Sequence, residues 1–439
     1  MYDLAIINGK VYQNQTFHST NIYIEGEKIV AISNELFPSK TVIDANHLEV
    51  LPGMIDPHVH FELDLGWIKS VDDFYSGSQA AIHGGITSII DFLEPVDNEV
   101  DLERAFNERL GHAKKAMVDY TFHTTIKNPK CDLEVFVKKM ISLGMYTLKL
   151  FTTYSDSNRR TYDQDIYQLL KLSKKYHFLI LAHIENDDLI QLNNQFTYQD
   201  LAISRPQLSE TSEALKLAQF VRETKGYLYM VHLSSGKTLK ALVENYSDII
   251  HKHFFVESCP QYFTFTEEKL KSKTGYLYTF APPLRQKEDQ DLLFQFHHYI
   301  DTIGTDHCAF MKKDKMKTIL SEIPLGIGGI EFSLPIMRKH LGNSVLEKMS
   351  PHVARIQGLK HKGKIEVGYD ADIIINHPID HLVKKHHGTC DYTVYQNMKI
   401  HGMPIIVIRR GYIVLDQGVL IYSQGKWIEG GPIHDQSNY

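Results

Sequence analysis

The sequence predicts a (β/α)8 barrel together with a small β-sandwich domain that both ends of the chain build. Three observations point to this fold. Both ends are rich in short β-type segments, and the middle alternates apolar runs with amphipathic stretches of helix length. The repeat in the middle is about 35 residues long, and seven such units span roughly the 250 residues that a barrel of this kind needs.

Short β-type segments at the two ends predict the smaller domain. These segments lie at residues 5–12, 21–33 and 40–51 near the start, and at residues 363–376 and 404–418 near the end. They are rich in β-branched residues, and Asn8-Gly9 is typical of a turn. We therefore expect a β-domain formed by residues 1–52 and 356–439, the second part including a terminal tail, and a barrel over residues 53–355.

Eight apolar runs in the middle of the chain predict the barrel strands. They lie at residues 53–61, 88–92, 119–126, 146–151, 178–184, 227–233, 254–263 and 300–308. Barrel strands are buried on both faces, so they are expected to be continuously apolar. Helices are predicted between them, for example at residues 101–117 and 211–224. A doubly wound open sheet is the alternative, but residues 58–64 lack the phosphate-binding loop that it would require.

The composition is that of an ordinary globular protein. The 439 residues carry a net charge of −6, from 47 basic and 53 acidic side chains, so nothing favours nucleic-acid binding. The 4 cysteines lie far apart without a CxxC pair, which argues against a disulfide scaffold or a zinc knuckle. No apolar run approaches the roughly 18–20 residues that span a membrane, and no basic, apolar leader opens the chain. We expect a cytoplasmic protein with no membrane or nucleic-acid partner.

Potential metal ligands occur at the ends of five of the predicted strands. The first strand ends in His58 and His60, the fourth in Lys149, the fifth in His183, the sixth in His232 and the eighth in Asp306. Carboxyl ends of barrel strands meet on one face, where active sites form. Residues i and i+2 of a strand point to the same side, so His58 and His60 can bind one ion. A single histidine at a strand end would more often be a core residue, so the inference depends on the common placement.

These residue types suit a pair of divalent metal ions. Imidazole and carboxylate groups bind zinc and similar ions. Two ions about 3.5–4 Å apart need a bridging anion. Lys149 lies between Leu148 and Leu150, where burial would lower its pKa. Its free amine could then add carbon dioxide and become a bridging carbamate. We therefore predict two divalent ions, zinc in the first instance, and N6-carboxylation of Lys149.

At these motifs the chain resembles the hydantoinase and dihydropyrimidinase family of cyclic amidohydrolases. The resemblance covers nearly the whole chain and includes residues 51–63, and residues 148–154 and 304–310 are its most discriminating pair of motifs. The ligands that it implies are His58, His60 and Asp306 for one zinc ion, and His183 and His232 for the other, with carboxylated Lys149 as the bridge. The resemblance also implies a homo-oligomer, either a tetramer or a dimer.

The resemblance further implies hydrolysis of a hydantoin- or dihydropyrimidine-type ring to an N-carbamoyl amino acid. A hydroxide between the two metals would attack the ring amide, and Asp306 would pass the proton to the leaving nitrogen. Tyr154, five residues after Lys149, would hydrogen-bond the substrate carbonyl and its oxyanion. The family holds the ring imide through backbone groups at two positions. Ala281 and Leu325 occupy them here, where serine and asparagine are usual.

Three other functions remain open: an allantoinase-like ureide hydrolase, a dihydroorotase, and a non-catalytic scaffold of the same fold. The scaffold is disfavoured because all six ligands are present. Dihydroorotase is disfavoured because no arginine follows His60, so a substrate carboxylate would meet Glu62 and Asp64 without a partner. We therefore expect a neutral five- or six-membered ring. The apolar wall expected for a ring substituent consists of Phe61, Leu65, Trp67, Phe151 and Tyr154.

Overall fold

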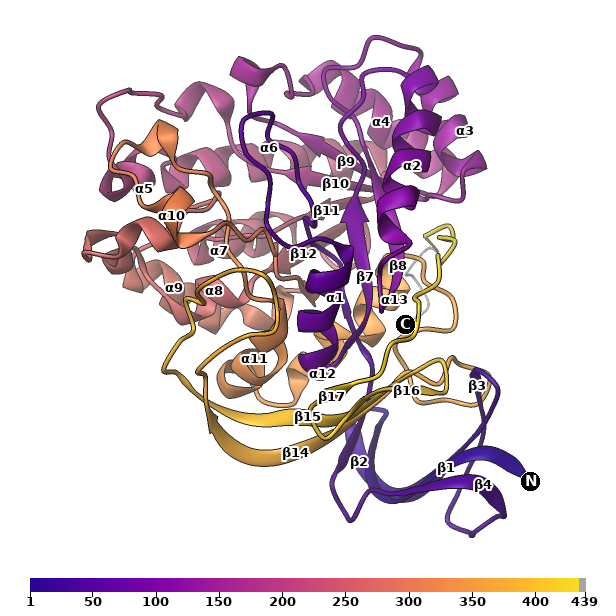
Figure 1. The fold of residues 1–439 in the computed structure, drawn as a ribbon. Coiled ribbons are helices and arrows are strands. Elements are labelled where there is room, and N and C mark those ends of the chain that lie inside the picture. The colour runs from indigo at the N-terminus through magenta and orange to yellow at the C-terminus, as the bar shows by residue number, and fades with distance from the viewer. Residues whose placement is uncertain (434–439) are drawn as a thin grey trace.

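Parallel strands form the barrel sheet, one of two sheets in the computed structural model, which describes residues 1–433 (Figure 1). The strands are β6 (Met54–Asp56), β7 (Ile86–Phe92), β8 (Asp119–Thr125), β9 (Thr147–Phe151), β10 (Leu179–His183), β11 (Leu228–Met230), β12 (Phe254–Ser258) and β13 (Thr302–Ile303). Each pairs with the next in chain order, and just beyond β6 and β13 Val59 bridges His307. The predicted barrel is thus confirmed, and each of the eight apolar runs contributes a strand.

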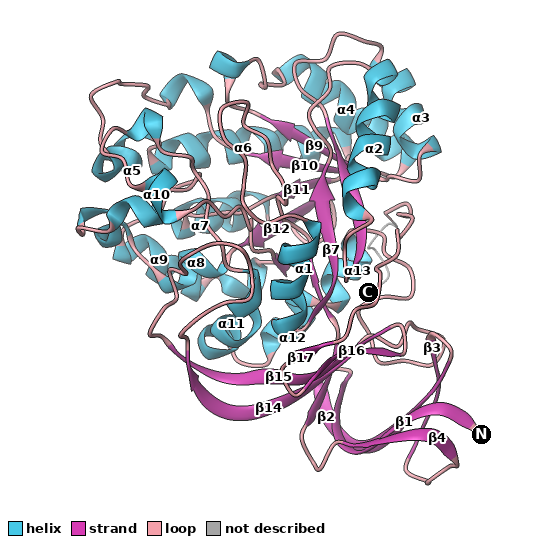
Figure 2. Cartoon of the chain, viewed as in Figure 1, coloured by secondary structure: helices cyan, strands magenta, loops and turns pink. Residues whose placement is uncertain are grey.

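Helices cover the outside of these strands (Figure 2). The helices of the described residues are α1 (Phe74–His83), α2 (Glu99–Ala113), α3 (Leu133–Ser142), α4 (Asp163–Tyr176), α5 (Leu201–Ser204), α6 (Gln207–Thr224), α7 (Gly236–Tyr246), α8 (Pro260–Thr264), α9 (Lys287–Gln295), α10 (Lys312–Lys315), α11 (Ser333–Leu341), α12 (Ser344–Met349) and α13 (Pro351–Ile356), and short ones such as α5 and α10 lie in the connecting loops. Capping side chains set several helix starts: Asp73 accepts the N–H of Ser76, and Asn98 caps α2. Within residues 1–433, no helix is both long and apolar enough to cross a membrane.

The barrel strands are buried on both faces, which explains why they read as continuous apolar runs. Every residue of β7 and β8 is buried. Leu148 and Leu150 of β9 belong to the same apolar core as Leu169 of α4 and Leu217 of α6. Each such buried side chain stabilises the fold by about 1.5–3 kcal/mol relative to an exposed one, so the core fixes the strand ends in space.

Both ends of the chain build the second sheet, which lies below the barrel in the view of Figure 1. Its strands are β1 (Tyr2–Gln13), β2 (Thr16–Glu25), β3 (Lys28–Ser33), β4 (Ser39–Asp44), β5 (Glu49–Pro52), β14 (Ile373–Leu382), β15 (Lys399–Arg409), β16 (Tyr412–Asp416) and β17 (Val419–Leu420). The antiparallel pair β5 and β14 joins the two halves, with Leu51 opposite Ile374. Ile24 and Ile408 share its core. The two-ended β-domain is therefore confirmed, and its boundaries at residues 52 and 355 stay a prediction.

An ionic cluster lies where the barrel meets this sheet. We use this name for the carboxylates of Asp119, Asp370 and Asp372 together with the cations of Lys362, Arg409 and Arg410. Lys362 Nζ lies 2.5 Å from a carboxylate oxygen of Asp119, 3.0 Å from one of Asp370 and 2.6 Å from one of Asp372. Asp119 begins β8, so the cluster lies at the amino ends of the barrel strands, opposite the predicted site.

Candidate active site

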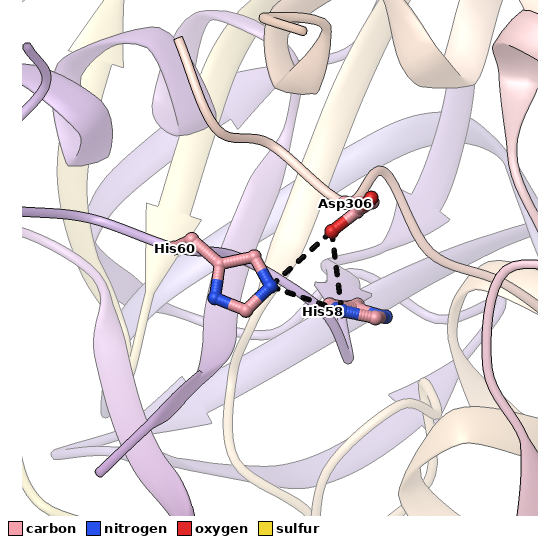
Figure 3. A group of neighbouring side chains, drawn as sticks. All are labelled: His58, His60 and Asp306. Atoms are coloured by element: carbon pink, nitrogen blue, oxygen red, sulfur yellow. Dashed lines mark hydrogen bonds and ion pairs between the residues drawn. The ribbon is translucent and has the colours of Figure 1, made fainter. Parts of the chain in front are cut away.

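Three predicted ligands converge at the carboxyl end of the barrel (Figure 3). His58 and His60 follow β6, and Asp306 follows β13. The two Nε2 atoms lie 3.2 Å apart, and each lies 3.2 Å from Oδ1 of Asp306. Burial alone would raise the pKa of Asp306, but its surroundings, including the hydrogen bond with His60, outweigh burial and lower that pKa. An ionised carboxylate and two ring nitrogens therefore point at one position.

The hydrogen bonds behind His58 indicate that this position suits a cation. His58 Nδ1 lies 2.8 Å from Oε1 of Glu257, and the same oxygen accepts the backbone N–H of His232. The network assigns the ring proton of His58 to Nδ1, which leaves a lone pair on Nε2. Burial lowers the pKa of His58 well below its ordinary value, so the ring is neutral. Lone pairs and a carboxylate that face each other in this way fit a divalent metal ion.

A second pair of histidines faces the same pocket. His183 is the last residue of β10, and its Nδ1 lies 3.0 Å from Nε2 of His232, which follows β11. His183 Nε2 lies 2.6 Å from Glu185, whose pKa falls to about 2 because Arg205 and His183 outweigh its burial. The ionised Glu185 keeps the His183 proton on Nε2, so its Nδ1 presents a lone pair. Nδ1 of His232 is buried and has no hydrogen-bond partner within residues 1–433.

Lys149 lies on β9 between these two groups of ligands. Its side chain is 2% exposed, and its Nζ lies 5.4 Å and 5.5 Å from the ring centres of Phe92 and Phe151. Burial lowers the pKa of the Lys149 amine to about 8. It forms no ion pair with any residue that the structure describes. An amine in this state is far easier to deprotonate than an exposed lysine, as carbamate formation requires.

Tyr154 stands on the loop after β9 and faces the histidine pair. Its backbone is left-handed, with a φ of 67°, and its ring centre lies 5.2 Å from that of His183. The Arg205 guanidinium lies 4.9 Å from the centre of its ring. Burial raises the pKa of Tyr154, so its hydroxyl stays protonated and remains a hydrogen-bond donor.

All six predicted ligands and Tyr154 line one pocket. Its volume is about 920 Å³ including its open mouth, which is within the usual range for small-molecule sites. The apolar part of its wall consists of Leu63, Leu65, Phe92, Leu93, Phe151 and Phe280. Ala281 and Leu325 also line it, and their contact with a ring stays a prediction. Arg159 and Glu94 line it as well and add one donor and one acceptor.

Two details of the predicted wall are wrong. Phe61 is fully buried and packs edge-on against Phe74, outside the pocket. Trp67 is 59% exposed and does not line the pocket. Glu62 and Asp64 line a neighbouring cleft, so they do not face a ring in this pocket. The chain turns away after Phe61 because Glu62 has a left-handed backbone with a φ of 49°.

Several supporting residues were not identified from the sequence. Glu257 and Glu185 determine which ring nitrogen carries the proton in His58 and in His183. Arg205 forms an ion pair with Glu185. An acidic residue inside the apolar run at 254–263 was a signal for the first of them. Gly304 is required by space, because a Cβ there would lie 2.7 Å from Oε2 of Glu257.

Comparisons with known proteins identify the family of this chain. A model of the amidohydrolase family matches residues 50–414. A D-hydantoinase of Geobacillus stearothermophilus is 30% identical, with 93% of this chain and 92% of the relative covered. A D-phenylhydantoinase of Escherichia coli is 29% identical, with 96% of each protein covered.

Solved structures give the same result. A D-hydantoinase (dihydropyrimidinase) from Thermus sp. matches with a TM-score of 0.92 at 28% identity, covering 98% of this chain and 99% of that chain. A dihydropyrimidinase from Brevibacillus agri matches with a TM-score of 0.91 at 27% identity, covering 98% and 99%. The chain therefore belongs to the amidohydrolase family, and within it to the hydrolases of the hydantoinase type.

Proposed function

We propose that this protein hydrolyses a cyclic amide of the hydantoin or dihydropyrimidine type to an N-carbamoyl amino acid, using two divalent metal ions. The observation that carries the proposal is the meeting of four imidazoles, Asp306 and a buried lysine at one pocket. The relatives named as hydantoinases and dihydropyrimidinases support the substrate class.

The donor groups divide naturally between two ions, which we propose to be zinc. One ion would use Nε2 of His58 and His60 with Asp306, because these atoms converge. The other would use Nδ1 of His183 and Nε2 of His232. Lys149, as its carbamate, would be the bridge. When bound, the ions would lower the pKa of a water and polarise the ring carbonyl.

Asp306 is proposed to move the proton. Its carboxylate is ionised at neutral pH, so it can accept a proton from the attacking water. The water oxygen forms a bond to the amide carbon, and the bond from that carbon to the ring nitrogen breaks. Asp306 returns the proton to the leaving nitrogen, so the ring opens to a carboxylate and a carbamoyl amine. One water is consumed, and its second proton is released to solvent when the new carboxylic acid ionises, so that atoms and charge balance.

Tyr154 is proposed to bind the carbonyl oxygen that becomes negative in this step. Its protonated hydroxyl is a donor, and hydrogen bonds to a developing oxyanion are worth more than those to the neutral carbonyl. Backbone groups at Ala281 and Leu325 are proposed to hold the imide edge of the ring, since both residues line the pocket.

The ring itself is proposed to be uncharged. No arginine stands directly after His60 at the metal ligands, and apolar side chains make up much of the wall beside the charged Glu94, Arg109 and Arg159. An allantoin-like ureide is the second candidate. The observation in its favour is that Arg159 and Glu94 line the pocket and could bind the carbonyl and the N–H groups of a ureido arm.

A panel of ring substrates tests this proposal. Hydantoin, dihydrouracil, allantoin and dihydroorotate are each incubated with the zinc-loaded protein, and ring opening is followed. We expect hydantoin or dihydrouracil to have a kcat/KM at least tenfold above dihydroorotate, a gap of about 1.4 kcal/mol in transition-state binding. An equal or higher kcat/KM for dihydroorotate would falsify the assignment, and preference for allantoin would select the second candidate.

Two further expectations accompany this function. We propose a homo-oligomer, either a tetramer or a dimer, and a reducing compartment such as the cytoplasm. The second is supported by four cysteines that all remain free thiols. Light scattering of the purified protein tests the first, and a monomer at micromolar concentration would contradict it.

A further inference from the structure

We propose that Lys315 is a positioning residue that ties together the two backbone segments holding the substrate ring. These segments are residues 279–281 and 325–326, and each contributes to the pocket wall. The inference rests on the proposed function, because the role of both segments in ring binding belongs to that proposal.

Lys315 connects the two segments through its amine. It ends the short helix α10, its side chain is fully buried, and its Nζ donates to the carbonyl of Thr279 at 2.7 Å and to that of Gly326 at 2.5 Å. The N–H of Gly326 also donates to the carbonyl of Thr279 at 3.0 Å. One amine therefore donates to the carbonyl of Thr279, which precedes Phe280 and Ala281. It also donates to the carbonyl of Gly326, which follows Leu325.

The second segment also lies directly on the strand end that carries a predicted metal ligand. A Cβ on Gly326 would lie 2.4 Å from the carbonyl oxygen of Cys308, which follows Asp306 by two residues. The position of the segment is thus fixed by its close packing against the carbonyl of Cys308 and by the hydrogen bond from Lys315. A ring held by this backbone would be held at a defined place relative to Asp306.

Burying a lysine amine at this place costs desolvation free energy, which argues that its hydrogen-bond donors have a role. The nearby thiols of Cys308 and Cys390 have pKa values raised by burial, so they are neutral, and Lys315 forms no ion pair with any described residue. Burial lowers the pKa of Lys315 to about 7. An apolar side chain would fill the same volume without this desolvation cost, but it would leave two buried carbonyls without these donors.

Lys348 offers a matched control at the other end of the barrel. It lies on α12, is 7% exposed, and donates to the backbone carbonyl of Ile300, just before β13. Burial lowers its pKa as well. Both lysines are buried and donate to backbone carbonyls. The two carbonyls that Lys315 binds belong to the segments of the pocket wall, whereas the one that Lys348 binds does not.

The test compares Lys315→Met with Lys348→Met in the full-length, zinc-loaded protein. We expect Lys315→Met to raise KM for hydantoin at least tenfold and to change kcat less than threefold, because backbone contacts to the ring act in the ground state and the transition state alike. Metal content should stay at that of the parent. Lys348→Met should leave KM within twofold of the parent value. Its thermal unfolding midpoint should fall by about as much as that of Lys315→Met.

An unchanged KM in folded Lys315→Met, or an equal rise of KM in Lys348→Met, would overturn the inference. A loss confined to kcat would also contradict it, since it would assign Lys315 to the chemical step. If Lys315→Met does not fold, Lys315→Gln retains a donor and should show a smaller rise in KM than tenfold but more than twofold. Failure of the proposed function is distinguishable, because the parent protein would then open no ring on the panel.

Discussion

The two ends of the barrel each gather buried charged groups, and they balance them in different ways. In the ionic cluster at the amino ends of the strands, three carboxylates surround Lys362 at 2.5 to 3.0 Å, and two arginines complete the balance. At the carboxyl ends, Asp306 faces ring nitrogens that carry lone pairs. Both groups have the spacing of metal ligands.

The difference lies in where the positive charge comes from. Lys362 occupies the centre of the ionic cluster, so the protein supplies its own cation and leaves no place for a metal ion. At the other end the pocket holds the buried Lys149, whose pKa burial lowers to about 8 and which forms no ion pair with any described residue. A cluster of ligands with its own cation stabilises the fold, whereas one without it is suited to bind a metal.

The largest expected effect is that of Lys149→Ala. Without the bridging group, we expect activity to fall at least 1,000-fold, or about 4 kcal/mol in transition-state stabilisation, with less than two bound zinc ions. Short carboxylic acids should restore part of both, because they can occupy the bridging position. Ring-opening assays and metal analysis measure this, and a crystal structure with a bare amine at full metal occupancy would reject the carbamate.

Asp306→Asn should come next, with a loss of about 100- to 10,000-fold in kcat, since an amide cannot carry the proton. The acid-side limb of the pH profile of kcat should disappear with it. Asp370→Asn, in the ionic cluster, is the matched control and should keep the parent kcat. Substantial turnover by metal-saturated Asp306→Asn would exclude the proposed role.

Lys362→Met should give the opposite pattern. Removing the central cation leaves buried carboxylates without a partner, so the free energy of unfolding should fall by about 3–5 kcal/mol. Zinc content and KM of the protein that remains folded should be unchanged. Denaturant unfolding together with metal analysis tests this, and a loss of zinc without a loss of stability would place a metal site in the ionic cluster.

Low pH should also destabilise the ionic cluster, but by less than Lys362→Met does. Burial favours the protonated acids, but Lys362 and the arginines outweigh it and lower the pKa of Asp119, and Lys362 likewise lowers that of Asp370. A lowered folded-state pKa adds stability above the unfolded value of about 3.9, and this stability is lost as the pH falls through that region. Asp372 opposes the trend in part, because burial raises its pKa.

We therefore expect the free energy of unfolding to fall by about 1–3 kcal/mol between pH 5 and pH 3. In Asp119→Asn the fall should be smaller, because the most strongly shifted acid of the cluster is gone. Denaturant unfolding at several pH values measures both slopes. Equal slopes in the parent and the variant would show that the acid sensitivity has another origin.

The fold was largely predictable from the sequence because burial on both faces makes a barrel strand continuously apolar. The candidate ligands were proposed for a related reason, since polar residues such as His183 and Lys149 stand out at the ends of such runs. Roles that depend on contacts between distant segments could not be read in this way. Glu257 reaches His58 across the barrel, and Lys315 binds carbonyls on two separate loops.

The errors in the predicted wall have a similar cause. Residues near each other in sequence were expected to share a surface, but Glu62 and Gly66 have left-handed backbones that redirect the chain. Phe61 consequently points into the core, and Trp67 reaches solvent. Side-chain direction after a strand depends on the loop conformation, which apolar patterning does not specify.

The zinc content of the protein after reconstitution and removal of loosely bound metal tests the central claim most directly. Atomic emission should find two zinc ions per chain in the parent and in Asp370→Asn, since the ionic cluster holds no metal in our account. It should find one or fewer in the double variant His183→Ala/His232→Ala, which keeps the group at His58. One ion or fewer in the parent, or a loss of zinc in Asp370→Asn, would contradict the account.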